Sequence, residues 1–148
     1  MAEPPPGPAR RHDVTTPDDV RLLVRRFYQA AIPDPLVGPV FHAAGIDWAS
    51  HVPLLFQFWE HELLGPAGYE GNVVRAHADA WARAPFGRAE LARWVELFEE
   101  TVDEYFAGPV AERAKGRARE VAAAITPAIA RRRRRAVGRA AVPTHDAG

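Results

Sequence analysis

Two histidines lie on the apolar sides of two short helical patterns, which a Gly-Pro-Ala-Gly loop at residues 65–68 separates. In the first pattern a histidine and four apolar residues fall at i, i+3, i+4, i+7 and i+8, which is one helix face: His51, Leu54, Leu55, Phe58 and Trp59. In the second, Val73, Val74 and His77 share a face by the same spacing rule. Two apolar walls that each carry one imidazole suit a flat, apolar ligand with a metal centre, such as haem.

His77 has Ala76 and Ala78 beside it, so its immediate neighbours offer the ring little hydrogen bonding. A buried imidazole left without a partner costs about 1–3 kcal/mol. An iron atom would satisfy Nε2 while Nδ1–H donates to a backbone carbonyl, which is the usual arrangement of a ligating histidine. Taken alone, a histidine on a short helix is more often an ordinary core or surface residue.

Tyr28 and Trp94 each occupy an apolar helix position where leucine would pack as well and need no polar partner. A hydroxyl and an indole N–H directed inward are useful if a polar diatomic molecule or a peroxide binds between them, because tyrosine donates or accepts and tryptophan donates. The alternative is aromatic core packing with a backbone carbonyl as the partner. His51 has the same two interpretations.

Four helices and a short connector are predicted to position these side chains. A helix capped by Thr16, with Pro17 at its first position, should run until Pro33 and Pro35 end it. Its apolar positions keep helical spacing: Val20, Leu23, Val24, Phe27, Tyr28 and Ala31. Residues 36–41 then form a short connector, expected to be a single turn.

The helix that carries His51 has an ambiguous start. Pro53 would lie past the first turn if Asp47 were the cap, so we favour a later start, with Ser50 as the cap or residues 48–50 in a tight turn. A long helix over about residues 89–106 and a last helix from Pro109 to about residue 125 follow, and Pro127 should kink or end the latter. No segment alternates with period two over a useful length, which predicts an all-α fold.

The 148-residue chain is expected to hold one domain, from 16 to 126, behind a disordered, proline-rich leader at 1–15 without an apolar signal sequence. No apolar run reaches membrane-spanning length, so we expect a water-soluble chain without membrane insertion. The chain has no cysteine, which excludes disulfides, thiolate metal sites and covalent haem attachment. A reducing cytoplasm is compatible with that composition.

The formal net charge of zero hides a polarity, because the segment 127–148 holds six arginines and one aspartate. The rest of the chain therefore carries five more acidic than basic side chains. This arginine-rich tail could extend the last helix or fray. Contact with nucleic acid, anionic lipid or an acidic surface is one interpretation. We favour a solvated, solubilising end, so nucleic acid is not the expected partner.

An ordered set of short motifs between about residues 17 and 125 resembles a group III truncated haemoglobin. The matching residues are Phe27-Tyr28, Leu36 to Phe41, Trp48 to His51, Phe58-Trp59, Leu63 to Gly65, Tyr69 to Gly71, His77 and Trp94 to Thr101. Each motif alone is unspecific, but their order is informative. The resemblance implies a two-over-two helical sandwich that encloses one non-covalent haem b.

The resemblance also assigns roles to individual residues. It makes His77 the proximal ligand of the haem iron, and Tyr28, His51 and Trp94 the distal residues. It implies a haem pocket of apolar side chains, with Phe41 packed on the macrocycle and a distal wall beside it: Phe41, Leu55, Phe58 and Phe98. The propionate contacts of this family are less fixed, so Arg75 and Arg93 are candidates by charge only.

With one protein ligand, an iron keeps an open distal position for oxygen or another small gaseous ligand. Carriage, sensing, peroxide turnover and nitric oxide dioxygenation all remain possible, the last two with a reductase still to be identified. Neither the physiological ligand nor the oligomeric state follows from these residues. The alternative is a haem-free helical interaction module that uses the arginine-rich tail to contact nucleic acid or an acidic partner.

Overall fold

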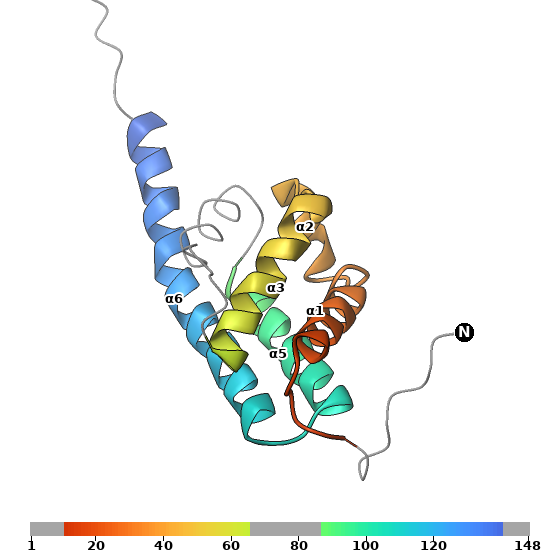
Figure 1. Ribbon diagram of the computed structural model, residues 1–148. Coiled ribbons are helices and arrows are strands. Elements are labelled where there is room, and N and C mark those ends of the chain that lie inside the picture. Colours follow the sequence, from red (N-terminus) through yellow and green to blue (C-terminus); the bar gives the residue numbers. More distant parts are fainter. Residues whose placement is uncertain (1–10, 66–86, 141–148) are drawn as a thin grey trace, which may run out of the picture.

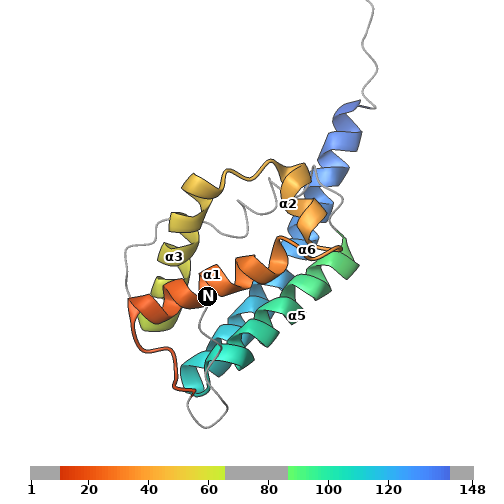
Figure 2. The same cartoon turned by 90° about the vertical axis from the view of Figure 1, so that its right-hand side faces the viewer.

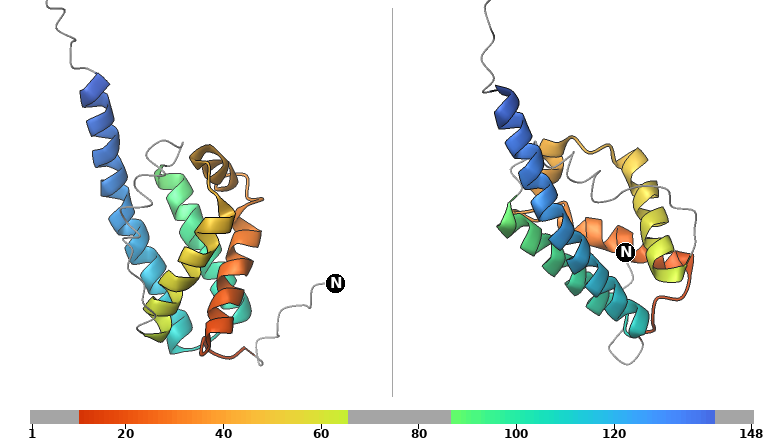
Figure 3. Two further views of the ribbon diagram at one scale, coloured as in Figure 1. Left: turned by 45° about the horizontal axis from the view of Figure 1, so that its top comes forward. Right: turned by 90° about the vertical axis from the view of Figure 1, so that its left-hand side faces the viewer.

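The computed structural model describes residues 11–65 and 87–140, and all regular structure within these ranges is helical. The helices are α1 (Pro17–Ala31), α2 (Gly38–Ala44), α3 (Trp48–Leu64), α5 (Arg88–Tyr105) and α6 (Pro109–Ala140). The pair α1 and α3 packs on the antiparallel pair α5 and α6, with α1 against α5 and α3 against α6 (Figures 1 and 2). The short helix α2 lies at one end of this two-over-two arrangement (Figure 3). The prediction of an all-α fold is confirmed.

Helix α1 forms as its sequence predicts. The Thr16 hydroxyl accepts a hydrogen bond from the N–H of Asp19 at 3.2 Å, and the Asp19 carboxylate accepts one from the N–H of Thr16 at 3.0 Å. This capping box satisfies two donors that a helix start leaves open. The six apolar positions of the predicted stripe are all buried.

The hairpin of α5 and α6 depends on small residues. Buried alanines on α6 let the two helices approach closely: Ala111, Ala114 and Ala118. Gly108, in the link between the helices, has φ +144°, and a Cβ there would lie 2.5 Å from Cγ of Asp13. The Asp13 carboxylate accepts hydrogen bonds from the N–H groups of Val110 and Ala111 at 2.9 and 2.8 Å. Asp13 and Val14, which is 1% exposed, were expected in a disordered leader but pack on the body here.

The start of α3 differs from the prediction. Asp47 is the cap: its side chain accepts from the N–H of Ala49, and its carbonyl accepts from the N–H of His51 at 2.9 Å. Pro53 therefore lies inside the helix. The residue whose carbonyl loses its partner, Ala49, is exposed, so water can replace the missing bond.

Two further predictions about the elements need correction. The connector around residue 38 is a seven-residue helix, α2, rather than a single turn. Leu54 is 53% exposed and does not belong to the buried stripe of α3, which consists of Leu55, Phe58, Trp59 and Leu63. A helix packed on one side cannot bury both Leu54 and Leu55 here, because consecutive residues point about 100° apart.

The last helix continues through Pro127 to Ala140. Pro127 and Ala123, the residue four positions before it, are exposed, so the freed carbonyl can be hydrated. Beyond the proline, Ala128 and Ile129 are still buried. The helix thus carries core residues past residue 126, where the sequence placed a domain boundary.

Candidate functional site

Four aromatic rings from three helices gather where α1 passes the start of α3. Tyr28 lies 5.8 Å from Phe41, 5.1 Å from Trp48 and 6.4 Å from His51, measured between ring centroids. Trp48 also contacts Phe41 and His51, at 5.4 and 5.9 Å. The fold thus brings together three of the predicted site residues. It adds Trp48, which we had not assigned a role although it lies three residues before His51 and so on the same helix face.

A second aromatic group lies deeper in the core. Phe27 meets Trp94 edge-on at 5.7 Å, and Phe98 stacks against Trp94 at 6.2 Å. Trp59 stacks on Phe98 at 4.7 Å, and this contact links α3 to α5. Because Phe27 also contacts Tyr28 at 4.8 Å, the two aromatic groups are continuous.

The apolar residues predicted for the pocket are buried among these rings. Phe41 is 5% exposed, Leu55 6%, Phe58 3% and Phe98 1%. They come from α2, α3 and α5, so three separate helices supply one apolar enclosure. The guanidinium of Arg117 lies 5.9 Å over the Phe58 ring, on the side of α6.

Trp94 carries the most informative polar atom of the site. Its Nε1 is buried, and it has no hydrogen-bond partner among the residues described. An indole N–H enclosed without an acceptor is costly, by about 1–3 kcal/mol. A buried N–H of this kind is retained most readily where a bound molecule supplies the acceptor.

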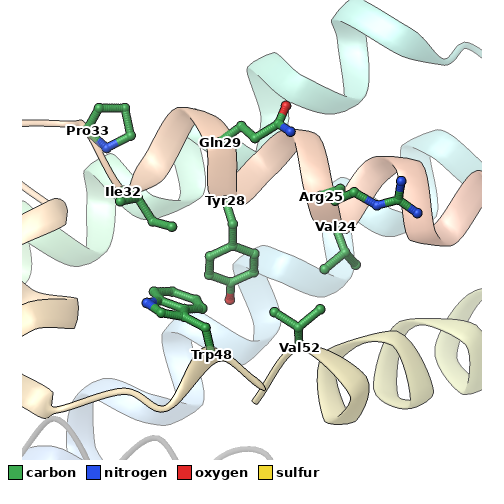
Figure 4. Close-up of a pocket in the computed structure, with 8 residues that line it drawn as sticks. All are labelled: Val24, Arg25, Tyr28, Gln29, Ile32, Pro33, Trp48 and Val52. Carbon is green, nitrogen blue, oxygen red and sulfur yellow. The ribbon is translucent and has the colours of Figure 1, made fainter. Parts of the chain in front are cut away.

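Tyr28 is a neutral hydroxyl in an apolar setting. Its ring projects from α1 towards the first turns of α3, with the hydroxyl end directed to Trp48 and Val52 (Figure 4). Burial raises the pKa of Tyr28 well above its ordinary value of 10.0. The side chain therefore keeps its proton, and the O–H remains available as a donor.

The same tyrosine forms part of a groove between α1 and α3. The groove has a volume of about 350 Å³, and its lining is mostly apolar (Figure 4): Val24, Arg25, Tyr28, Gln29, Ile32, Pro33, Trp48 and Val52. It opens beside Ile32, which is 49% exposed. A small apolar molecule could approach Tyr28 along it.

His51 is only partly buried, on the first turns of α3. Partial burial lowers the pKa of its imidazole below the ordinary 6.5. The neutral ring is therefore favoured in the folded protein at neutral pH. A charged ring at this position would be drawn towards water.

The other predicted site residues divide into two groups. His77 and Arg75 lie outside the described residues, so their assignments stay predictions. Arg93 is engaged elsewhere: its Nε is 3.0 Å from the carboxylate of Asp34, and its Nη1 is 3.1 Å from that of Glu96. It could reach a further anionic group only by sharing or leaving these contacts.

The residues described offer no ready-made metal site from histidine, cysteine or carboxylate side chains, since no three of them cluster. Nor does any helix in residues 11–65 and 87–140 combine the length and apolar character needed to cross a membrane.

No protein-family model matches this chain. Over 90 residues it is 29% identical to the group 3 truncated hemoglobin ctb of Campylobacter jejuni, a match that covers 58% of this chain and 68% of that protein. The crystal structure of a group III truncated hemoglobin from Campylobacter jejuni superimposes with a TM-score of 0.67 at 25% identity, covering 78% of this chain and 91% of that one. The resemblance expected from the sequence is thereby confirmed, and the chain is a truncated globin in fold, similar to the group III truncated haemoglobins in both sequence and structure.

Proposed function

We propose that the chain binds haem, with His77 as the proximal ligand, and holds a small ligand at the distal side between Tyr28 and Trp94. The buried Trp94 Nε1, which has no hydrogen-bond partner in residues 11–65 and 87–140, carries this proposal. In a truncated-globin fold, an acceptor for that N–H is what a diatomic ligand or a peroxide would provide. Tyr28 contributes a second neutral donor from the neighbouring helix.

The residues fit a non-covalent haem. The wall of buried aromatic and aliphatic side chains suits an apolar macrocycle: Phe41, Leu55, Phe58 and Phe98. Without cysteine, the chain cannot form thioether links to the porphyrin. When bound, haem would supply an iron with one position open to an exogenous ligand. For the propionates, Arg75 is the stronger candidate, because Arg93 already pairs with Asp34.

The distal side chains would then act on the ligand in two ways. The donors at Tyr28 and Trp94 stabilise a ligand that gains negative charge, and an enclosure of low polarity strengthens both bonds. His51 lies nearer the solvent and controls access. Oxygen carriage uses only these contacts, whereas nitric oxide dioxygenation or peroxide turnover would also need a reductase.

Haem binding is tested by the absorption spectrum of the purified protein. We expect a Soret band in the wild type. In His77→Ala, haem should be lost or weakly held, and added imidazole should partly restore the spectrum by filling the space left behind. Full haem occupancy with an unchanged ferrous spectrum in His77→Ala would exclude this residue as the ligand. A wild-type protein without a Soret band, even after reconstitution with haem, would favour the haem-free interaction module.

A further inference from the structure

The end of α6 extends beyond the packed body. Its last buried residues are Ala128 and Ile129, whereas residues 131–138 are exposed apart from the half-buried Arg132. Figures 1 and 3 show this end of the helix projecting past the other helices. At a rise of 1.5 Å per residue, the ten residues after Ala130 extend for about 15 Å.

Helical continuity aligns three arginines on this extension. Arg131, Arg134 and Arg135 stand at i, i+3 and i+4, so their side chains share one face. All three are exposed, and none forms an ion pair with another described residue. The sequence alone favoured a solvated end over a nucleic-acid contact and left open whether this segment frays. A frayed chain would hold no such face, whereas the helix does.

Several cations on the other part of α6 are placed differently, because carboxylates of the same chain pair with them. Lys115 contacts Asp103 at 2.8 Å, and Arg117 contacts Glu62 at 3.0 Å. Arg119 contacts Glu99 at 2.5 Å. The carboxylates of α5 are thus largely engaged within the chain, which argues against a second copy of the chain as the partner of the arginine face.

A membrane surface fits this extension poorly. Helices that lie in a lipid interface carry a broad apolar face with large side chains such as Trp, Phe or Leu. Between residues 131 and 140 the only large apolar side chain is Val137. The extension offers charge without an apolar face, which matches a partner bound through charge alone.

We propose that the face formed by Arg131, Arg134 and Arg135 binds the phosphate backbone of duplex nucleic acid without base specificity. Guanidinium groups bind phosphate oxygens with two parallel hydrogen bonds. The major groove of DNA is about 12 Å wide and admits an α-helix, so a helical rod of about 15 Å can lie in it. This surface is distant in sequence from the aromatic site, and the proposal does not depend on haem binding.

The test measures binding of the full-length chain to a fluorescently labelled 20-base-pair duplex by anisotropy, over a series of salt concentrations. The triple variant Arg131→Gln, Arg134→Gln, Arg135→Gln keeps good helix formers but removes three charges. Its plot of log K against log salt should be shallower by about 2.7, since each lost phosphate contact contributes about 0.9. Its affinity at low salt should fall at least about tenfold.

Two control variants distinguish binding through this arginine face from binding through the net charge of the protein. The triple lysine variant at the same positions should keep the salt slope of the wild type. A triple glutamine variant at the exposed Arg21, Arg88 and Arg119 makes the same change in net charge elsewhere and should bind nearly as well as the wild type. Circular dichroism confirms that each variant is folded.

The proposal is overturned if the wild type does not bind the duplex, or if it binds only vesicles of phosphatidylcholine and phosphatidylserine. It is equally overturned if the Arg21, Arg88 and Arg119 variant loses as much affinity as the Arg131, Arg134 and Arg135 variant. In that case net charge, and not the aligned face, would determine binding.

Discussion

At the scale of single residues, the site is an aromatic enclosure with two neutral donors in it. The Trp94 Nε1–H has no acceptor among the described residues, and the Tyr28 hydroxyl keeps its proton because burial raises its pKa. Both side chains are neutral, so neither compensates a charge on a neighbouring group. In the function that we propose, both side chains donate hydrogen bonds to a small polar ligand.

Replacement of each donor by phenylalanine should therefore speed oxygen release. Trp94→Phe and Tyr28→Phe each remove one hydrogen bond worth about 1–3 kcal/mol, which corresponds to roughly a 5- to 150-fold faster dissociation. Carbon monoxide gains less charge on binding, so its dissociation should change less. Stopped-flow measurement of both ligands checks this. If both variants release oxygen within twofold of the wild type, these rings serve packing only.

His51 should make ligand association depend on pH. Burial lowers the pKa of its imidazole, so the midpoint should lie below 6.5. Below that midpoint the ring is charged, moves towards water and leaves the path open, and association should be faster. In His51→Ala this pH dependence should flatten, with association changed more than dissociation. If the variant associates like the wild type at every pH but releases oxygen faster, His51 bonds to the ligand instead.

At the scale of elements, most of the helices could be predicted from spacing. The cap of α1 and its six buried positions follow from local rules, since Thr16, Pro17 and the apolar spacing all indicate the same helix. A later helix start was expected at Pro53 and a kink or an end at Pro127, but both helices continue through their proline, and for one physical reason. Pro53 and Pro127 each deprive a carbonyl of its partner, but both prolines and the residues four before them are exposed, and exposure is a property of the fold rather than of the local sequence.

The burial of the candidate site residues could be predicted for the same reason, whereas their roles towards a ligand stay predictions. Tyr28, Trp94 and Phe98 fall on apolar stripes, and the resemblance gave them roles. The stacking of Trp59 on Phe98 joins residues 39 positions apart, which spacing within one helix cannot reveal. The pairing of Arg93 with Asp34, which weakens its candidacy for a propionate, is likewise a tertiary contact.

Asp34 connects two elements and should matter for stability. Its side chain is 6% exposed; it accepts from the N–H groups of Leu36 and Val37 at 3.0 Å each and pairs with Arg93 on α5. Burial opposes ionisation and is the largest single influence. The hydrogen bonds from Val37, Leu36 and Arg93 outweigh it together, so the pKa of Asp34 is lowered.

Asp34→Ala should destabilise the fold by about 1–3 kcal/mol, because the buried N–H of Val37 loses its acceptor. Asp34→Asn keeps an acceptor oxygen and should therefore lose less stability. The folded pKa lies below the unfolded value of about 3.9, so the contribution of this carboxylate is present above that pH and is lost as the pH falls through the folded pKa. Denaturant unfolding at pH 7 and at pH 3 measures this. If Asp34→Ala lowers the free energy of unfolding equally at pH 7 and at pH 3, the ionised carboxylate has no role in stability.

At the scale of the whole molecule, charge and core separate along α6. The last fully buried residue of α6 is Ile129, and the arginines begin two residues later. The same helix therefore serves the body with one half and projects from it with the other. Removing the second half should therefore remove positive charge without lowering the stability of the fold.

Deletion of residues 131–148 should leave the absorption spectrum of the bound haem and the thermal unfolding midpoint close to those of the full chain. The removed residues contribute no side chain to the buried core that the structure describes, whereas Ala128 and Ile129 remain. Ile129→Ala in the full chain is the matched control. It leaves every arginine in place but removes buried apolar volume, which costs about 2–5 kcal/mol. If the deletion lowers the midpoint as much as Ile129→Ala does, the arginine-rich end belongs to the folded core. The conclusion that this end lies outside the core would then be wrong.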